Sequence, residues 1–554
     1  MTSTFKRKHT LATLAGTLAL AVAGTPVLAQ SLDGMSASID RLRASSFRHH
    51  PERGEVRLAE IKSFGAARPA LPLDPHLSIF VSDVESTSQL KFSEVMEQLV
   101  RQGRHKGQTR LELFHQWWDV AAQSPGLGLG PHCDDESAPV GNAADFSALA
   151  TRNGFPYRCP RFEQTEAQSD PFADESAPAG YSAIAFSNRF DLIGSDVADP
   201  QQPWRLITPD CGEYRIVFAR NSGKTAAAVD STSALRRNLI IFEARVPNPK
   251  PRDGRAGCRP ILDFWHGLSD RSISAVERGK RLRRFYLEGL PQHHVGPIVD
   301  LAHYTFGSGQ IRTNQFLNAR TASPPSPVDW TLREFKTVAE SDGKVAIVPD
   351  SVKTNPGNDL FLASSVDPRV APLTQEIRAQ LPQLAGLGLA PSASPVDRIN
   401  AIGFNVSGEG INAFESDEKD PEIGDVAVAY SGASGTTENP VLKAAIQDAL
   451  TKENLTLTPA QVVNRIKTQT CSGCHRFSDP GVSPLTDLGG GAVWPAKSNG
   501  DATHPKMAFT QESERDDDLQ PAIVGSGKRY AISLAVEEFL VAREAFMKKA
   551  LGLH

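Results

Sequence analysis

The chain has 554 residues, of which 40% are hydrophobic and 22% are charged, and its formal net charge is −5 at pH 7. This composition is ordinary for a globular protein that builds real hydrophobic cores, and the length suggests two or three domains. The negative net charge argues against a nucleic-acid-binding protein.

The N-terminus has the pattern of a secretory signal peptide. Residues 6–8 are basic, residues 11–24 form an apolar stretch of about 14 residues, and residues 27–29 form a small-residue cleavage site. We therefore expect residues 1–29 to be removed, which leaves a mature chain of net charge −8 in the periplasm or outside the cell. The apolar stretch is too short for a membrane anchor, and we expect no membrane span in the mature chain.

Residues 30–75 read as an irregular lead-in, and residues 76–379 as an α+β domain of unknown role. Apolar spacing predicts helices over 92–101, 110–122 and 272–287. Short runs of β-branched and aromatic residues predict a mainly antiparallel sheet. Its expected strands are 214–218, 239–244, 310–316, 330–338 and 344–348.

A stretch rich in Pro, Ala, Gly and Ser at 380–396 predicts a linker, although it could also be a surface loop within one larger domain. After it, helical patterns predict an all-α domain over residues 397–554. Thr458 suits the N-cap of one helix, and Gln461 can complete its capping box. A final helix is expected over 531–551.

Cys471, Cys474 and His475 form a Cys-x-x-Cys-His run, the pattern for covalent attachment of haem c. Each thiol can form a thioether to a haem vinyl group, and the adjacent histidine can ligate the iron. A thioredoxin-like dithiol would follow a strand and begin a helix, whereas this pair follows a predicted helix. A zinc site would need a further ligand that no second Cys pair supplies.

A helix, this motif, a Gly/Pro-rich loop and a last helix together resemble the small class of c-type cytochrome domains. The resemblance covers roughly residues 440–554 and implies that the last helix packs across the helix before the motif. It also implies a distal ligand in the loop, which we assign to Met507, with His504 or an open iron site as alternatives. Trp494 and Phe509 are expected to shield the haem.

The function expected from these residues is single-electron transfer by an exported monohaem protein with a redox partner protein. Two alternatives remain. An open iron site would suit a haem enzyme of the peroxidase or oxygenase kind, and an unused motif would leave a secreted, non-catalytic binding protein. No catalytic constellation is evident in the rest of the chain.

The other four cysteines are an even number in a chain predicted to be exported, which indicates two disulfides. Three connectivities are possible, and free buried thiols are the alternative. We expect sequential pairing, Cys133–Cys159 and Cys211–Cys258, because each closed loop is then short.

Basic side chains cluster on the predicted helix over 272–287. They form either a solvated face or a docking surface for an anionic partner or for the acidic run at 516–518. The residues are Arg278, Lys280, Arg281, Arg283 and Arg284.

Overall fold

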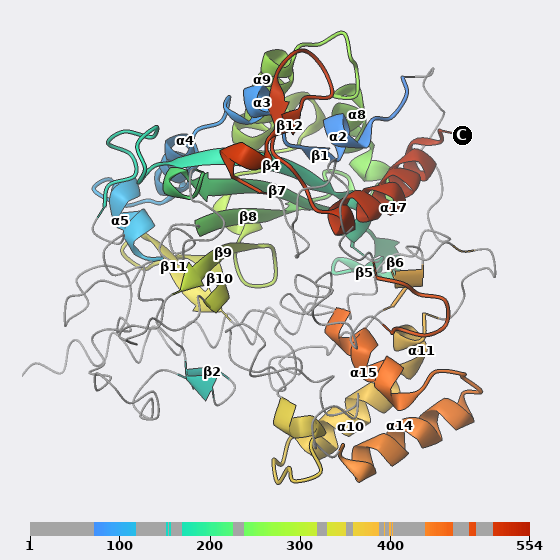
Figure 1. Ribbon diagram of the computed structural model, residues 1–554. Coiled ribbons are helices and arrows are strands. Elements are labelled where there is room, and N and C mark those ends of the chain that lie inside the picture. The colour runs from blue at the N-terminus through green and yellow to red at the C-terminus, as the bar shows by residue number, and fades with distance from the viewer. Residues whose placement is uncertain are drawn as a thin grey trace, which may run out of the picture. The chain divides into compact units, whose positions relative to one another are not determined.

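The computed structural model gives one broad sheet region and a group of helices (Figure 1). The residues that it describes are 71–117, 151–152, 155–156, 169–194, 196–224, 238–317, 329–350, 358–386, 393, 398–399, 401–402, 438–468, 487–494 and 513–553.

A seven-stranded, wholly antiparallel sheet dominates the described residues, with strand order β1-β4-β7-β8-β9-β10-β11. Its strands are β1 (Phe80–Val81), β4 (Tyr181–Arg189), β7 (Asp210–Arg220), β8 (Asn238–Pro247), β9 (Gln310–Leu317), β10 (Asp329–Ala339) and β11 (Val345–Asp350). Three two-stranded pairs accompany it: β2 (Thr151–Arg152) with β3 (Phe155–Pro156), β5 (Val197–Asp199) with β6 (Gln202–Ile207), and β12 (Gln520–Pro521) with β13 (Lys528–Arg529).

The α-helices are α2 (Pro75–Ser78), α3 (Val84–Thr87), α4 (Phe92–Gln102), α5 (Arg110–His115), α8 (Arg259–Gly267), α9 (Ala275–Glu288), α10 (Val370–Ala379), α11 (Leu381–Leu384), α14 (Pro440–Lys452), α15 (Pro459–Thr468) and α17 (Leu534–Leu551). Short 3₁₀ turns are η2 (Phe190–Leu192), η3 (Asn221–Gly223), η4 (Pro251–Cys258), η5 (Pro291–His293), η6 (Leu301–His303), η7 (Asn358–Phe361) and η10 (Asp516–Asp518).

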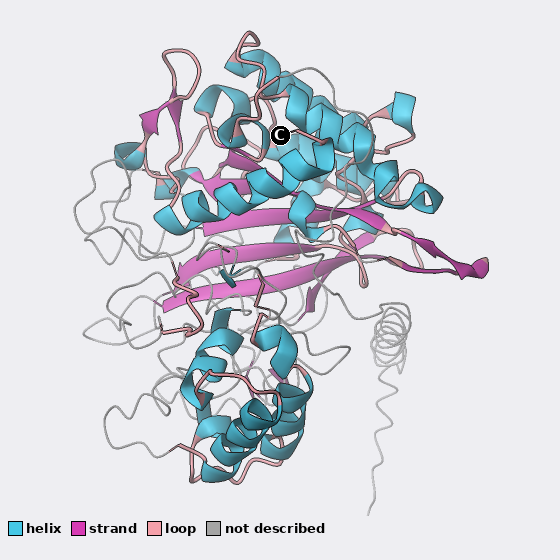
Figure 2. Ribbon diagram, turned by 90° about the vertical axis from the view of Figure 1, so that its right-hand side faces the viewer, coloured by secondary structure: helices cyan, strands magenta, loops and turns pink. Residues whose placement is uncertain are grey.

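Helices lie against the sheet (Figure 2), and aromatic side chains join them to one of its faces. Phe92 of α4 is fully buried, with its ring centroid 5.1 Å from that of Phe218 and 5.0 Å from that of Tyr181. Tyr214 of β7 likewise stacks on Trp265 of α8 at 5.8 Å. Side chains alternate between the two faces of a strand, so these contacts identify the face that the helices cover.

The C-terminal part of the chain packs against the first described residues of the sheet region. The backbone N–H of Tyr530 donates to the carbonyl oxygen of Ser82 at 2.9 Å, and the hydroxyl of Ser82 donates to the carbonyl oxygen of Tyr530 at 2.9 Å. On α17, which lies beside α2 and α8 (Figure 1), Phe546 meets Phe190 edge-on at 5.7 Å. The segment from Tyr530 to Leu551 therefore contributes to the core of the sheet region.

The predicted fold class, with an all-α cytochrome c-like domain over 397–554, is wrong. This part of the chain contains the β12–β13 pair, and most of the apolar stripe of α17 joins the sheet core. Only Phe539 of α17 packs against the cluster that contains Val463 and Ile466. Apolar periodicity showed that α17 buries one face, but it cannot show which element covers that face.

A second apolar cluster joins α10, α11, α14 and α15. Leu381 and Leu384 on α11 and Val462 on α15 are all fully buried in it. Part of the expected linker, at 387–392 and 394–396, lies outside the described residues, so the boundary at 380–396 stays a prediction. No described helix is long and apolar enough to cross a membrane.

Several helix ends follow the expected local chemistry. The side chain of Thr109 caps α5, which ends at His115 and is therefore shorter than the helix predicted over 110–122; residues 118–122 lie outside the described residues. The last helix begins later than predicted, after the N-cap Ser533, and ends as expected at Gly552, whose φ of 73° suits glycine.

Replacing Phe92 with Ala is expected to lower the free energy of unfolding by about 3–5 kcal/mol, because it opens a cavity among packed aromatic rings. Urea unfolding of purified protein measures this. Val366→Ala is the control, since Val366 is 97% exposed, and it is expected to change stability by less than about 0.5 kcal/mol. Equal effects of the two substitutions would contradict this account of the core.

Candidate functional site

The haem ligands expected from the sequence cannot be placed geometrically. Cys471, Cys474 and His475 lie outside the described residues, as do Met507 and His504. The described residue nearest before the motif is Thr468, the last residue of α15. On either side of the motif, α15 and residues 487–494 belong to the described part of the chain.

The start of α15 is confirmed as predicted. The backbone N–H of Gln461 donates to the Thr458 hydroxyl at 3.2 Å, and the Gln461 side chain accepts from the Thr458 backbone N–H at 2.9 Å. This capping box satisfies two backbone donors at the end of the helix. Val463 and Ile466 then bury the apolar face of α15 in the helical cluster.

Arg465 holds α15 against the segment that follows the motif. Its side chain is buried and donates to three backbone carbonyl oxygens, those of Leu488 (2.6 Å), Leu384 (2.8 Å) and Gly489 (2.9 Å). Burial lowers the pKa of Arg465 to about 10, so the side chain stays charged at neutral pH. The chain before Cys471 and the chain after residue 486 thus share one buried cation.

Trp494 is expected to shield the haem, and its role there stays a prediction. It is buried, and its ring meets Phe539 of α17 edge-on at 5.4 Å. Both residues pack with the apolar face of α15. The predicted packing of α15 on the last helix thus reduces to the contacts of Phe539, and Phe509 lies outside the described residues.

A group of charged and polar side chains lies on the sheet face opposite the aromatic rings. On four neighbouring strands, an acid or amide is followed two residues later by a base. The pairs are Glu213 and Arg215 on β7, Glu243 and Arg245 on β8, Gln310 and Arg312 on β9, and Glu334 and Lys336 on β10. We name these eight residues the charge row.

Ion pairs connect the charge row from strand to strand. Glu243, with a side chain only 1% exposed, accepts from Arg215 at 3.1 Å and from Arg312 at 2.8 Å. Arg312 also forms an ion pair with Glu334 at 3.0 Å, and Glu334 accepts from Lys336 at 3.0 Å. The register places Arg215 opposite Glu243 and Arg312 opposite Glu334.

Glu213 and Glu334 of the charge row are held ionised, because each has a lowered pKa. Burial raises the pKa of Glu213, but the guanidinium groups of Arg215 and Arg189 outweigh it and lower that pKa to about 2. For Glu334, burial is likewise outweighed by Lys336 and Arg312, and the pKa is lowered. Charges so matched favour a network that fixes strand pairing over an acid–base catalyst. The alternating acid-x-base pattern was visible in the sequence, and our sequence analysis missed it.

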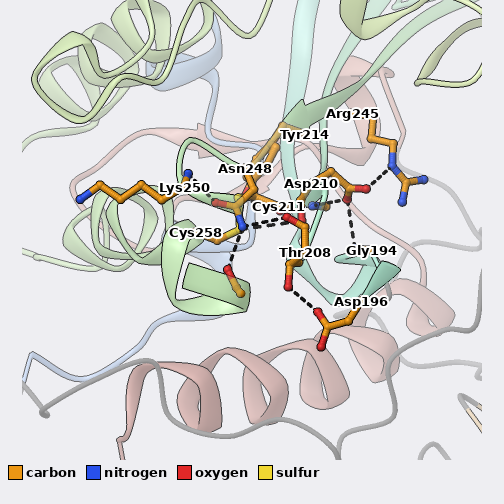
Figure 3. Close-up of a disulfide and its surroundings, with 12 residues drawn as sticks. Gly194, Asp196, Thr208, Asp210, Cys211, Tyr214, Arg245, Asn248, Lys250 and Cys258 are labelled. Carbon is orange, nitrogen blue, oxygen red and sulfur yellow. Dashed lines mark hydrogen bonds and ion pairs between the residues drawn. A yellow bond between two sulfur atoms is a disulfide. The ribbon is translucent and has the colours of Figure 1, made fainter. Parts of the chain in front are cut away.

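The disulfide Cys211–Cys258 is confirmed, with its Cα atoms 5.4 Å apart, and it joins the start of β7 to the residue before α8 (Figure 3). Next to it, Asp210 accepts from the backbone N–H groups of Gly194 and Gly212, each at 3.0 Å, and from Arg245 at 2.7 Å. The other predicted pair, Cys133–Cys159, lies outside the described residues.

The basic run on α9 is divided between core and surface. Arg278 is fully buried, whereas Arg283 pairs with Glu94 and Arg281 with Glu277. In the described part of the chain, no group of three or more His, Cys, Asp or Glu side chains could hold a metal ion.

Comparison with protein-family models, curated proteins and solved structures finds no match to this chain.

The charge row is expected to make the free energy of unfolding depend on pH in the acid range. The pKa of Glu213 is about 2 in the folded protein, below its ordinary value of 4.5. Its ionised form therefore stabilises the fold above about pH 4.5, and this stabilisation is lost as the pH falls towards 2. Glu213→Gln is expected to lower stability at pH 7 and to flatten its loss between pH 4.5 and pH 2.5.

Chemical unfolding at a series of pH values tests this. Glu453→Gln is the matched control, because Glu453 is exposed at the end of α14. A Glu213→Gln profile parallel to that of the wild type would contradict the role given to the buried carboxylate.

Proposed function

We propose that this chain is an exported monohaem c-type protein that passes single electrons to a redox partner protein. The observation that carries the proposal is the Cys-x-x-Cys-His run formed by Cys471, Cys474 and His475. The proposal rests on these side chains and does not require a cytochrome c-like domain fold.

The donor set fits covalent haem c. Two thiols at this spacing match the two vinyl groups of haem, and the imidazole of His475 is a suitable proximal ligand. Bound haem would supply a one-electron redox centre. Met507 is the proposed distal ligand, with His504 as the alternative donor in the same loop.

Two structural features support the proposal without testing it. First, α15 is anchored by Arg465 directly before the motif, which suits a segment that must hold a rigid prosthetic group. Second, the Cys211–Cys258 disulfide favours an oxidising compartment, in agreement with the signal peptide proposed at residues 1–29. The net negative charge supports a protein partner over nucleic acid.

Expression with the haem-attachment machinery is expected to yield one covalent haem per chain, detected by the pyridine-haemochrome spectrum and by intact mass. His475→Ala is expected to abolish stable iron ligation. His293→Ala is the matched control, since His293 is an exposed histidine of the sheet region. Wild-type protein without covalent haem would overturn the proposal.

Replacing Met507 with Ala is expected to open the sixth coordination position, so that the variant binds cyanide and its visible spectrum changes. His504→Ala is the control and is expected to retain the wild-type spectrum. If only His504→Ala changes the spectrum, the distal ligand is His504. Cyanide binding by the wild type would instead indicate an open iron site and a haem enzyme.

A further inference from the structure

A small pocket lies where residues 523–529 meet α3 and α9. The volume open to the centre of a water-sized sphere is about 10 Å³, roughly what a single water molecule needs. The residues that line it are His76, Leu77, Ser82, Asp83, Arg278, Ile523, Val524 and Arg529. They come from three distant parts of the sequence. The chain around β12 lies near α3 (Figure 1), and β13 contacts α3.

Three of the lining side chains carry a buried polar atom with no hydrogen-bond partner among the described residues. These atoms are Oδ2 of Asp83, Nη1 of Arg278 and Nε of Arg529. Arg278 is 0% exposed and Asp83 is 7% exposed. A buried polar atom without a partner is costly, so three around one pocket point to an occupant that satisfies them.

Other polar atoms of Asp83 and Arg278 already make hydrogen bonds. Oδ1 of Asp83 accepts from the backbone N–H of Ser86 at 2.8 Å, which caps α3. Nε of Arg278 donates to the carbonyl oxygen of Leu268 at 3.0 Å. These bonds fix both side chains and leave Oδ2 of Asp83 as an acceptor and the NH₂ group at Nη1 of Arg278 as a donor without a partner among the described residues.

Close packing and strand pairing bring the three side chains together. A Cβ atom at Gly279 would lie 2.3 Å from the carbonyl oxygen of Ser86, so α9 can approach α3 this closely only with glycine there. A β-bridge joins Asp83 to Arg529. Arg529 also lies 3.7 Å from Glu537 of α17, which limits its freedom to turn away.

We propose that this pocket is a binding site for one ordered water molecule, held by Asp83, Arg278 and Arg529. The occupant must accept hydrogen bonds from two guanidinium groups and donate one to a carboxylate. A halide accepts but cannot donate, and it would face the charge of Asp83. A metal cation would face two arginines, and an organic acid exceeds the available space. Water meets all three requirements.

Donor counting gives a sharp test. In Asp83→Asn, the amide oxygen is expected to stay on the Ser86 N–H and the amide NH₂ to face the pocket. Three donors would then surround the site and the carboxylate charge would be gone. The variant is expected to admit a halide that the wild type excludes.

The experiment is a high-resolution crystal structure of the full mature chain soaked in bromide, with anomalous data at the bromine edge. The wild type is expected to show an oxygen-sized peak without anomalous signal, and Asp83→Asn an anomalous peak at the same place. Asp174→Asn, at an exposed aspartate, is the control and is expected to keep the wild-type peak. If Asp83→Asn does not fold, the wild-type data still decide.

An anomalous peak in the wild type would mean an anion site and would overturn the proposal. No peak in the wild type would overturn it as well. An Asp83→Asn protein that keeps the oxygen-sized peak and excludes bromide would contradict the donor count.

Discussion

The pairing of buried charges across the sheet sets the strand register, and the aromatic face of the sheet follows from that register. Glu243 is almost completely buried between Arg215 and Arg312, so a shift of one strand by one residue would move its partners to the other face. Removing one partner would leave an uncompensated buried charge, which costs several kcal/mol. The register of β7 to β10 is thereby held, and with it the aromatic face on which α4, α8 and α9 pack.

The segments on both sides of the proposed haem-binding motif are anchored by the fold. Before the motif, α15 is fixed in the helical cluster by Arg465 and its apolar face. After the motif, Tyr530 and α17 are fixed on the N-terminal part of the sheet region. In the sequence, the proposed haem-binding residues thus fall between two anchored segments, and the rings of Phe539 and Trp494 are in contact between these segments.

The cysteines have two distinct uses in this account. Cys211 and Cys258 close a loop of 47 residues between β7 and α8, which restricts the unfolded chain and favours an oxidising environment. Cys471 and Cys474 are proposed to be consumed by thioether bonds instead. A c-type haem protein needs the same exported location, so both uses agree with the signal peptide expected at residues 1–29.

Features that depend on neighbouring residues could be predicted from the sequence. These include the capping box of Thr458 and Gln461 and the end of the last helix at Gly552, because each follows from chemistry within a few positions. The packing of α17 on the sheet and the bridge between Arg529 and Asp83 became visible only in the folded chain. Periodicity reports that a face is buried, but the partner that buries it is chosen by shape and charge from residues hundreds of positions away.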